Sequence, residues 1–541
     1  MYATITAWLL LIGLLFSCPR LHAAKIYPRQ SPPVVQGEEP ANAGLLITEI
    51  MYNPPDLSTP SGATVEGGDL EFIELHNRGT HAVNLAGIFF SQGIEYAFPA
   101  TASPLEPDAR LVLASSEAGF IAKYGFAPYA EYSGQLDNGG ETLRLTDETG
   151  ADLLVQPYGD DSSWPCGPDG GDFSLVPAMA DAPGSAASWR RSAQAGGSPG
   201  LPDPPAPPDP LPVIINEVLA HTDLPAEDSV EFYNPSEYDA YMGGWWLSDT
   251  TDNAQRYQLP EGFYVPAGGY AVITESHFGA GAAGFGFSEN GEEVVLTAAT
   301  CAGAPTDYRQ VQPFGASPNG VSLGRYVNNV GAIHFPLLES VTLGGENAPP
   351  LISDVVISRI MYHPPDGAHE FIQVTNRSAQ PAPLFLEGSP RLVWQISGVG
   401  DFTLPPNLTL GPDESMLLVP IAPDQFRERY AIPPEVPIIG PYPGNLNNDG
   451  ETIALLAPGP PNAVGPQPYF EMDVVTYSDT APWPSEADGE GAALARIALD
   501  QYGNDPDNWR ALGKADAFIL LPIVRQGERT SLRPARKPHT P

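Results

Sequence analysis

The sequence predicts an all-β protein made of three tandem β-sandwich domains. Short runs such as LLITEIM, EFIEL and YAVITES alternate in polarity and are separated by Gly, Asn, Asp and Pro, which is typical of strands and tight turns. Asn138-Gly139, Asn290-Gly291 and Asp449-Gly450 predict type I′ hairpin turns. No segment keeps a helical period over three turns, and only Phe120–Tyr124 and Asp424–Tyr430 predict short helices.

Internal repeats predict the number of domains. MYNPP at Met51–Pro55 returns as MYHPP at Met361–Pro365, and LDNGGETLRL at Leu136–Leu145 returns at the same offset as LNNDGETIAL at Leu446–Leu455. A more divergent copy lies between them, where VEFYN at Val230–Asn234 corresponds to IELHN in the first copy. The repeat is too long for a solenoid and suits one independent domain per copy.

These repeats, together with changes in composition, predict the order of segments. The LPDPPAPPDPLP segment between the first two copies predicts a semi-rigid polyproline II spacer, so we expect the flanking domains to be separable. The predicted organisation is a signal peptide at 1–24, a lead-in linker at 25–44, the first domain at 45–200, a proline-rich linker at 201–212, a divergent second domain at 213–345, a second linker at 346–354, a third domain at 355–515, and an apolar then basic tail at 516–541.

The start of the chain predicts export. Ala7–Cys18 is uncharged and too short to span a bilayer, and small residues suited to cleavage follow it. We therefore expect a secreted or cell-surface protein. Two alternatives stay open, namely retention of this segment as an anchor and lipidation at Cys18, and only these imply contact with a membrane.

Composition narrows the class of partner. Sixty-five acidic residues against 25 basic ones give a net charge of −40, which disfavours nucleic acid. The charge indicates solubility outside the cell or, alternatively, weak calcium binding at the surface. Cys166 and Cys301 fall in different copies, so they predict neither a disulfide framework nor a zinc site, and a bridge between the domains stays open.

The order of the motifs points to a family. Each copy opens with a strand like ITEIMYNPP, continues with EFIEL-x-N and a Gly-containing turn, and then has a Leu-x-Asn-x-Gly-Glu hairpin. Trp189-Arg190 and Trp509-Arg510 come late in the first and third copies. This resembles the lamin tail domain as it occurs in secreted bacterial proteins. The resemblance implies an immunoglobulin-like β-sandwich that serves as an accessory or surface module, sometimes beside extracellular hydrolases.

Carboxylates recur after the hairpin turns and are the candidate metal ligands. Glu141, Glu292 and Glu451 occupy the same place in the three copies, so a repeated calcium ligand is one interpretation. Calcium takes six to eight oxygens, and one carboxylate after a turn supplies few of them; solvation of the turn and strand edge is the favoured interpretation. Glu49 and Glu217 align with Arg359, so that position holds no ligand needed in all copies.

The motifs that could indicate catalysis lack the neighbouring elements and spacing that a catalytic site needs. Gly196–Gly200 fits G-x-S-x-G, but no buried strand precedes it and no helix follows it, so we expect a domain-closing turn and not a nucleophile. The histidines lack zinc-site spacing, and His363 and His369 are expected on a surface loop. Tryptophans such as Trp164 and Trp483 are expected to anchor the core, with sugar stacking as the alternative.

The sequence therefore predicts a non-catalytic exported protein whose β-sandwich modules serve extracellular or cell-envelope binding, adhesion or spacing. No catalytic residue or cofactor is predicted, and Ca²⁺ is the one candidate ion. The expected partner is an extracellular protein or a glycan. The alternative is a calcium-dependent glycan-binding accessory protein or an uncharacterised extracellular hydrolase.

Overall fold

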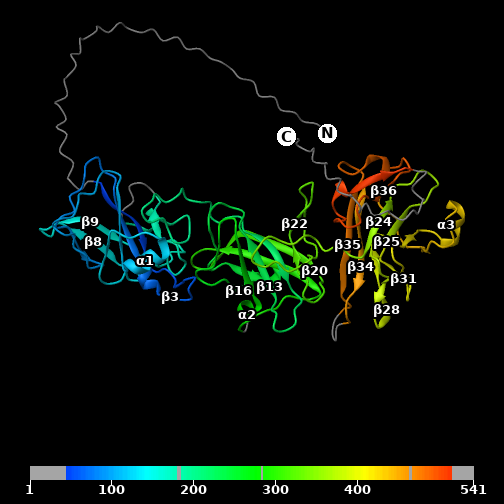
Figure 1. Ribbon diagram of the computed structural model, residues 1–541, viewed down its shortest axis with the longest axis horizontal. Helices are drawn as coiled ribbons and strands as arrows, with labels where there is room; N and C mark the ends of the chain where they lie inside the picture. Colours follow the sequence, from blue (N-terminus) through cyan, green and yellow to red (C-terminus); the bar gives the residue numbers. More distant parts are fainter. Residues whose placement is uncertain (1–43, 179–183, 282–283, 462–465, 514–541) are drawn as a thin grey trace, which may run out of the picture.

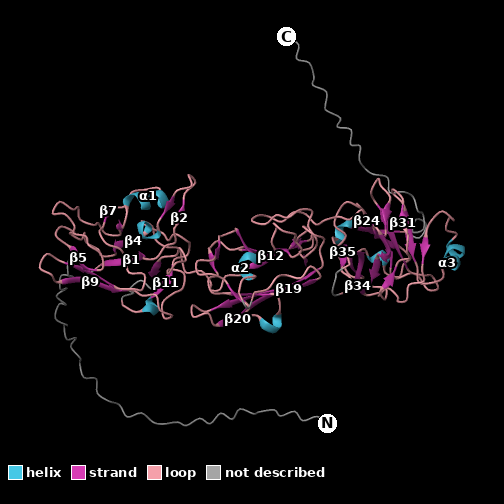
Figure 2. Ribbon diagram, turned by 90° about the horizontal axis from the view of Figure 1, so that it is seen from below, coloured by secondary structure: helices cyan, strands magenta, loops and turns pink. Residues whose placement is uncertain are grey.

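The computed structural model describes residues 44–178, 184–281, 284–461 and 466–513. The predicted signal peptide, nearly all of the lead-in and the tail from 516 onward lie outside these ranges. Three two-sheet units follow one another in a row, coloured blue to cyan, green, and yellow to red (Figure 1). We call residues 44–200, 213–345 and 355–513 the first, second and third units. Strands dominate each of them (Figure 2), and no helix in the described ranges is long and apolar enough to cross a membrane.

The first unit packs a six-stranded sheet, in the order β11-β10-β1-β4-β6-β7, on a three-stranded sheet, β5-β8-β9. Its strands are β1 (Leu45–Met51), β2 (Leu57–Ser58), β3 (Thr64–Val65), β4 (Phe72–Asn77), β5 (Phe89–Gln92), β6 (Arg110–Ala114), β7 (Ala130–Glu131), β8 (Thr142–Thr146), β9 (Asp152–Pro157), β10 (Leu175–Pro177) and β11 (Trp189–Arg191), and its helices are η1 (Gly67–Leu70), α1 (Glu117–Tyr124) and η2 (Ala186–Ser188).

The second unit packs two four-stranded sheets, β18-β13-β12-β21 and β16-β15-β19-β20. Its strands are β12 (Ile214–Leu219), β13 (Ser229–Tyr233), β14 (Ala240–Tyr241), β15 (Trp246–Ser248), β16 (Tyr257–Gln258), β17 (Tyr264–Val265), β18 (Tyr270–Thr274), β19 (Gly291–Ala299), β20 (Pro305–Gly315), β21 (Leu323–Gly324), β22 (Tyr326–Val327) and β23 (Ile333–His334), and its helices are η3 (Thr251–Asn253) and α2 (Glu275–Phe278).

The third unit repeats the arrangement of the first, with sheets β33-β32-β25-β24-β36-β37 and β30-β29-β34-β35. Its strands are β24 (Val355–Met361), β25 (Phe371–Asn376), β26 (Ala382–Pro383), β27 (Phe385–Leu386), β28 (Ser389–Val393), β29 (Gln395–Ser397), β30 (Phe402–Thr403), β31 (Thr409–Leu410), β32 (Ser415–Leu418), β33 (Ile438–Ile439), β34 (Gly450–Pro458), β35 (Tyr469–Ser478), β36 (Ala493–Arg496) and β37 (Trp509–Leu512), and its helices are α3 (Pro423–Tyr430), η4 (Ser485–Ala487) and η5 (Pro506–Asn508).

The first strand pair carries the same irregularity in every unit. The antiparallel register shifts between Ile47 and Glu49 in β1, between Ile215 and Glu217 in β12, and between Ile357 and Arg359 in β24. A β-bulge re-aims the side chain that follows it. The residue after the bulge, which is Glu49, Glu217 or Arg359, therefore has the same position relative to the sheet in all three units.

Each unit has its own hydrophobic core between its two sheets, which makes the fold an all-β, immunoglobulin-like sandwich. In the first unit, Ile73 and Leu75 of β4 face this core. Phe72 of the same strand points to the other side, against Phe120 of α1. Both faces of β4 are thus covered, and all of its residues are buried. The two helices predicted from sequence are present as α1 and α3.

The predicted type I′ hairpin turns are not hairpins in the structure. The strands before and after each turn belong to the two opposite sheets and do not pair: β7 and β8 in the first unit, β18 and β19 in the second, and β33 and β34 in the third. A type I′ turn also needs two consecutive residues with positive φ. In the turn of the first unit only Gly140 has positive φ, at 94°, and its N–H donates to the Asp137 carbonyl over 2.9 Å; Gly291 and Gly450 play the same part in the other units. Each turn therefore connects the two sheets of its sandwich.

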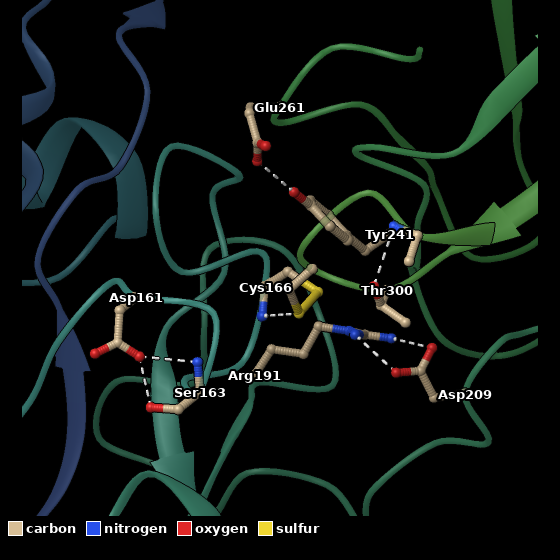
Figure 3. Close-up of a disulfide and its surroundings, with 10 residues drawn as sticks. Asp161, Ser163, Cys166, Arg191, Asp209, Tyr241, Glu261 and Thr300 are labelled. Atoms are coloured by element: carbon tan, nitrogen blue, oxygen red, sulfur yellow. Dashed lines mark hydrogen bonds and ion pairs between the residues drawn. A yellow bond between two sulfur atoms is a disulfide. The ribbon is translucent and has the colours of Figure 1, made fainter. Parts of the chain in front are cut away.

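A disulfide joins the first two units. Cys166 is bonded to Cys301, with their Cα atoms 5.2 Å apart. Beside it, the Arg191 guanidinium pairs with Asp209 and lies over the ring of Tyr241 (Figure 3). Tyr241 also packs edge-to-face with Phe173 of the first unit, at 5.8 Å between centroids. This junction combines a covalent bond with packed aromatic and ionic contacts.

The proline-rich segment 201–212, predicted to be a semi-rigid spacer, makes contacts with both flanking units. Asp203 pairs with Arg190 over 2.6 Å, and Arg190 Nη2 donates to the Pro204 carbonyl. At the other end, Leu211 is buried in the core of the second unit. The charged residues between the prolines provide contacts that the proline content alone did not suggest.

Candidate functional site

The three turn glutamates, Glu141, Glu292 and Glu451, hold the turns that precede β8, β19 and β34. In each unit one carboxylate oxygen accepts a hydrogen bond from the backbone N–H four residues earlier: from Asp137 over 3.2 Å, from Ser288 over 2.5 Å and from Asn447 over 2.7 Å. The structure therefore places all three candidate residues at equivalent positions, as turn caps. Burial raises the pKa of Glu292 to about 7.

Tyrosine hydroxyls complete this arrangement in the first and third units. Tyr158 Oη lies 3.1 Å from Glu141 Oε1, and Tyr477 Oη lies 3.0 Å from Glu451 Oε1. Each of these rings packs against the tyrosine of the MYxPP motif, with centroids 5.0 Å apart for Tyr52 and Tyr158 and 4.6 Å apart for Tyr362 and Tyr477. The opening motif and the turn are thus linked through these tyrosines.

A second carboxylate beneath the turn was missed by sequence reasoning. Glu71 accepts from Leu136 N over 2.8 Å and from Tyr132 Oη over 3.2 Å. Glu370 accepts in the same way from Leu446 N over 3.0 Å and from the hydroxyl of Tyr442. Burial raises the pKa of Glu71 to about 7 and also raises that of Glu370. The signal was available, because both glutamates precede Phe-Ile in the repeated EFI motif.

The equivalent acid in the second unit is Asp228. Asp228 accepts a hydrogen bond from Thr222 Oγ1 over 3.0 Å and another from the Phe287 N–H. Burial raises the pKa of Asp228, and these hydrogen bonds partly offset that rise. Phe287 stands just before the turn of that unit, as Leu136 does in the first. An acid at this position fastens the start of the turn to the sheet in all three units.

The third set of carboxylates lies on the bulged strand pair. Glu49 and Glu74 face each other across β1 and β4. Glu49 Oε1 accepts from Ser174 Oγ over 2.6 Å and from Ser198 N over 2.7 Å, and Glu74 accepts from Gly200 N over 2.7 Å. The Gly196–Gly200 segment, whose sequence matches a nucleophile elbow, is therefore a closing turn, as predicted. Glu49 and Glu74 hold it through the backbone N–H groups of Ser198 and Gly200.

The second unit reproduces this closure with a different segment. Glu217 and Glu231 are cross-strand partners. Glu217 accepts from Thr342 N over 3.0 Å and from Ser322 Oγ over 2.6 Å, and Glu231 accepts from Gly344 N. In both units a pair of buried glutamates thus fastens the segment that leads into the next unit.

The third unit departs from this pattern. Arg359 and Gln373 are the cross-strand partners at the equivalent position, and both are buried. The exchange replaces two acceptors with a cation and an amide. The segment fastened by Glu49 and Glu217 therefore has no counterpart held by carboxylates at this position in the described part of the third unit.

Chemically, these carboxylates are hydrogen-bond acceptors for the chain's own turns. Within the described ranges, no group of three or more His, Cys, Asp or Glu side chains is placed to hold a metal ion. Each turn glutamate directs one oxygen to its own turn, and Ca²⁺ requires several oxygens at once. Calcium binding at Glu141, Glu292 or Glu451 stays a prediction to be tested.

The remaining residues predicted from sequence lie apart from one another. His363 Nδ1 lies 2.5 Å from Asp488 Oδ1, and the His369 N–H donates to the Tyr430 hydroxyl. Trp483 is buried in the core of the third unit, and Trp164 packs against the core of the first. The tryptophans thus anchor cores, as expected.

Comparison with known proteins supports the family resemblance for part of the chain. The family model described as Lamin Tail Domain matches residues 38–160 and 206–308. No curated protein and no solved structure matches the chain significantly. The matched ranges contain the opening bulged strand pairs, the buried acids and the turn glutamates Glu141 and Glu292. Two regions of this chain, in its first and second units, are therefore similar to the lamin tail domain, as their motifs predicted.

Proposed function

We propose that the protein is a non-catalytic, exported scaffold in which three lamin-tail-like sandwiches present surfaces for binding, adhesion or spacing outside the cytoplasm. The third unit is counted as a copy because it shares the strand order of the first and the bulge at Arg359. Its turn before β34 is also capped in the same way, by Glu451.

One observation carries this proposal: the recurring carboxylates are used to fasten the chain to itself. Glu49 and Glu217 hold the segments that leave the first and second units, and Glu141 and Glu451 hold turns that connect the two sheets of their units. Such a plan suits a protein that maintains the shape and relative placement of its modules. A catalytic site, in contrast, needs titratable groups directed at a substrate.

The disulfide favours an extracytoplasmic location. Structural disulfides form and persist in oxidising compartments and are rare in the cytosol. The Cys166–Cys301 bond is consistent with the uncharged, Leu-rich run near the N-terminus that predicts export. Both features support secretion or display at the cell surface.

Binding to isolated cell envelopes tests the proposal. The purified chain, with its disulfide intact, is incubated with envelope fragments and sedimented, with and without calcium and with a chelator. We expect saturable binding that calcium does not control. Binding that requires calcium and is lost in Glu451→Ala would favour the calcium-dependent accessory protein. Turnover of envelope polymers by the purified chain would favour the hydrolase, and no binding at all would contradict the proposal.

A further inference from the structure

The second and third units enclose an open cleft of about 860 Å³. One wall belongs to the second unit and carries Tyr233, Tyr270 and Tyr326. The opposite wall is the loop before β37, which contributes Asp500, Gln501, Tyr502 and Asp505, and the segment 346–352 forms the floor. The volume lies within the range of small-ligand sites in proteins.

Four tyrosine rings line the cleft in two pairs. Tyr233 and Tyr270 are cross-strand partners on β13 and β18, and their rings stack with centroids 4.9 Å apart. Tyr326 and Tyr502 meet from opposite walls, edge to face, at 5.1 Å. All four side chains are partly exposed. Flat apolar rings that stay partly open to solvent are suited to packing against another flat, partly apolar surface.

The walls are held in place by contacts between the two units. Tyr326 Oη donates to Asp505 over 3.1 Å, and Asn328 Nδ2 donates to the Asn504 carbonyl over 3.0 Å. On the floor, Asn347 Nδ2 donates to the carbonyls of Asn216 and Arg325. The aromatic pairs therefore have a fixed spacing, which lowers the entropic cost of binding a ligand between them.

The rim offers both donors and acceptors. Within the described ranges, the Arg325 guanidinium, the Gln501 amide and the carboxylates of Glu339, Glu346 and Asp500 make no hydrogen bond or ion pair with another side chain or with the backbone. A ligand with many hydroxyl groups, which both donate and accept, matches this mixture. Three carboxylates against one guanidinium disfavour an anionic ligand, and Arg325 disfavours a polycation.

We propose that this cleft is a calcium-independent binding site for a neutral oligosaccharide. The apolar C–H faces of the sugar rings pack on the tyrosine pairs, and the hydroxyl groups bond to Arg325, Gln501 and the rim carboxylates. The inference rests on the proposed function, because it names the ligand class that the binding scaffold takes at one surface.

The test uses the full chain and a panel of neutral hexasaccharides: maltohexaose, cellohexaose, laminarihexaose and chitohexaose. Calorimetry and ligand-observed NMR measure the dissociation constant of each, in the presence of a chelator. We expect at least one to bind, and Tyr233→Ala and Gln501→Ala each to weaken that binding about tenfold. The Gln501 side chain is exposed and lies outside the cores of the second and third units. The Gln501→Ala variant should therefore fold, and it keeps the test valid if the tyrosine variant misfolds.

Tyr129→Ala is the matched control, because Tyr129 is an exposed tyrosine of the first unit, remote from the cleft. Its binding should equal that of the unmodified chain. The proposal is overturned if no hexasaccharide of the panel binds, or if the cleft variants bind as tightly as the control. Envelope sedimentation of the same variants separates the two hypotheses: retained envelope binding with no hexasaccharide binding removes the oligosaccharide site and leaves the proposed function standing.

Discussion

Glu49 lies directly opposite Glu74 on antiparallel strands, and both carboxylates are buried while they accept hydrogen bonds from the Ser198–Gly200 turn. Two like charges in such a place repel each other unless one is neutralised. Arg110 pairs with Glu74, whereas burial raises the pKa of Glu49 to about 8. The buried Glu49 carboxyl is therefore protonated at neutral pH and places no charge beside the Arg110–Glu74 ion pair.

This pair predicts how stability depends on pH. A carboxyl whose pKa is about 8 when folded and 4.5 when unfolded contributes stability that is complete below pH 4.5 and lost as the pH rises through 8. Glu49→Gln stays neutral, so its free energy of unfolding should fall less from about pH 6 to about pH 9, by on the order of 1–3 kcal/mol. Denaturant unfolding at both pH values measures this. Glu148→Gln, at an exposed site, should behave as the unmodified chain does, and equal slopes for all three would refute the assignment.

The junction between the second and third units should weaken in acid. Burial lowers the pKa of His334 below 6.5, opposed by the nearby charge of Asp505. The ring nitrogens face the side-chain amides of Asn328 and Asn504 at 3.2 Å. The stabilising contribution of the neutral ring is present above pH 6.5 and lost as the pH falls further. Amide hydrogen exchange in 326–334 and 503–505, measured relative to the intrinsic exchange rate at each pH, should be faster below that pH.

His334→Gln provides the comparison for this acid effect. The variant has no group that titrates in this range, so exchange in the same segments should vary little with pH after correction for intrinsic rates. If the junction segments of the unmodified chain exchange at the same corrected rate above and below pH 6.5, the expected role of His334 is contradicted.

Cleavage in the proline-rich segment should leave the first two units joined. Any cut in 201–212 falls within the loop closed by Cys166 and Cys301. We expect the nicked chain to migrate as one species without reductant and to separate into fragments with it, as gel electrophoresis after limited proteolysis will show. In Cys166→Ser with Cys301→Ser, the cut should release fragments without reductant and should occur faster. Fragments released from the oxidised chain would mean that the bond is absent in solution.

The turn glutamates should stabilise the fold without calcium. Glu451→Ala removes the acceptor for Asn447 N and Tyr477 Oη, and we expect it to cost about 1–3 kcal/mol. Glu435→Ala, at an exposed site on the same unit, is the control. Sodium chloride should raise the melting temperature by screening the net charge of −40. At fixed ionic strength calcium should add little, whereas a saturable rise well below one millimolar calcium would identify a dedicated calcium site.

The sequence was sufficient for the fold because the decisive signals are local. Alternation over five to seven residues and a glycine after each turn predicted strands and turns, and the repeated motifs placed Glu141, Glu292 and Glu451 at equivalent positions. The hairpin assignment was wrong, because the strands before and after each turn belong to opposite sheets and do not pair. One glycine with positive φ serves this connection, and the turn brings the Glu451 carboxylate to Asn447 N.

The structural roles that were missed depend on contacts between distant segments. Glu49 meets Ser198 and Cys166 meets Cys301 only after the units have folded and packed. The role of Glu71 was missed because its motif is explained by the burial of the neighbouring Phe72 and Ile73. The cleft between the second and third units combines residues from 216 to 505, and no sequence pattern marks such a combination.

The Cys166–Cys301 bond also determines how the molecule responds to mechanical tension. A pull on the two ends of the chain passes from Cys166 directly to Cys301, because the covalent bond is shorter than the intervening 135 positions. Strands β10–β19 and segment 201–212 lie between the two cysteines and are outside the shortest covalent path while the bond is intact. Reduction followed by unfolding of these strands would add up to about 450 Å of chain length, so the oxidation state of two cysteines determines how far this row of sandwiches can be stretched.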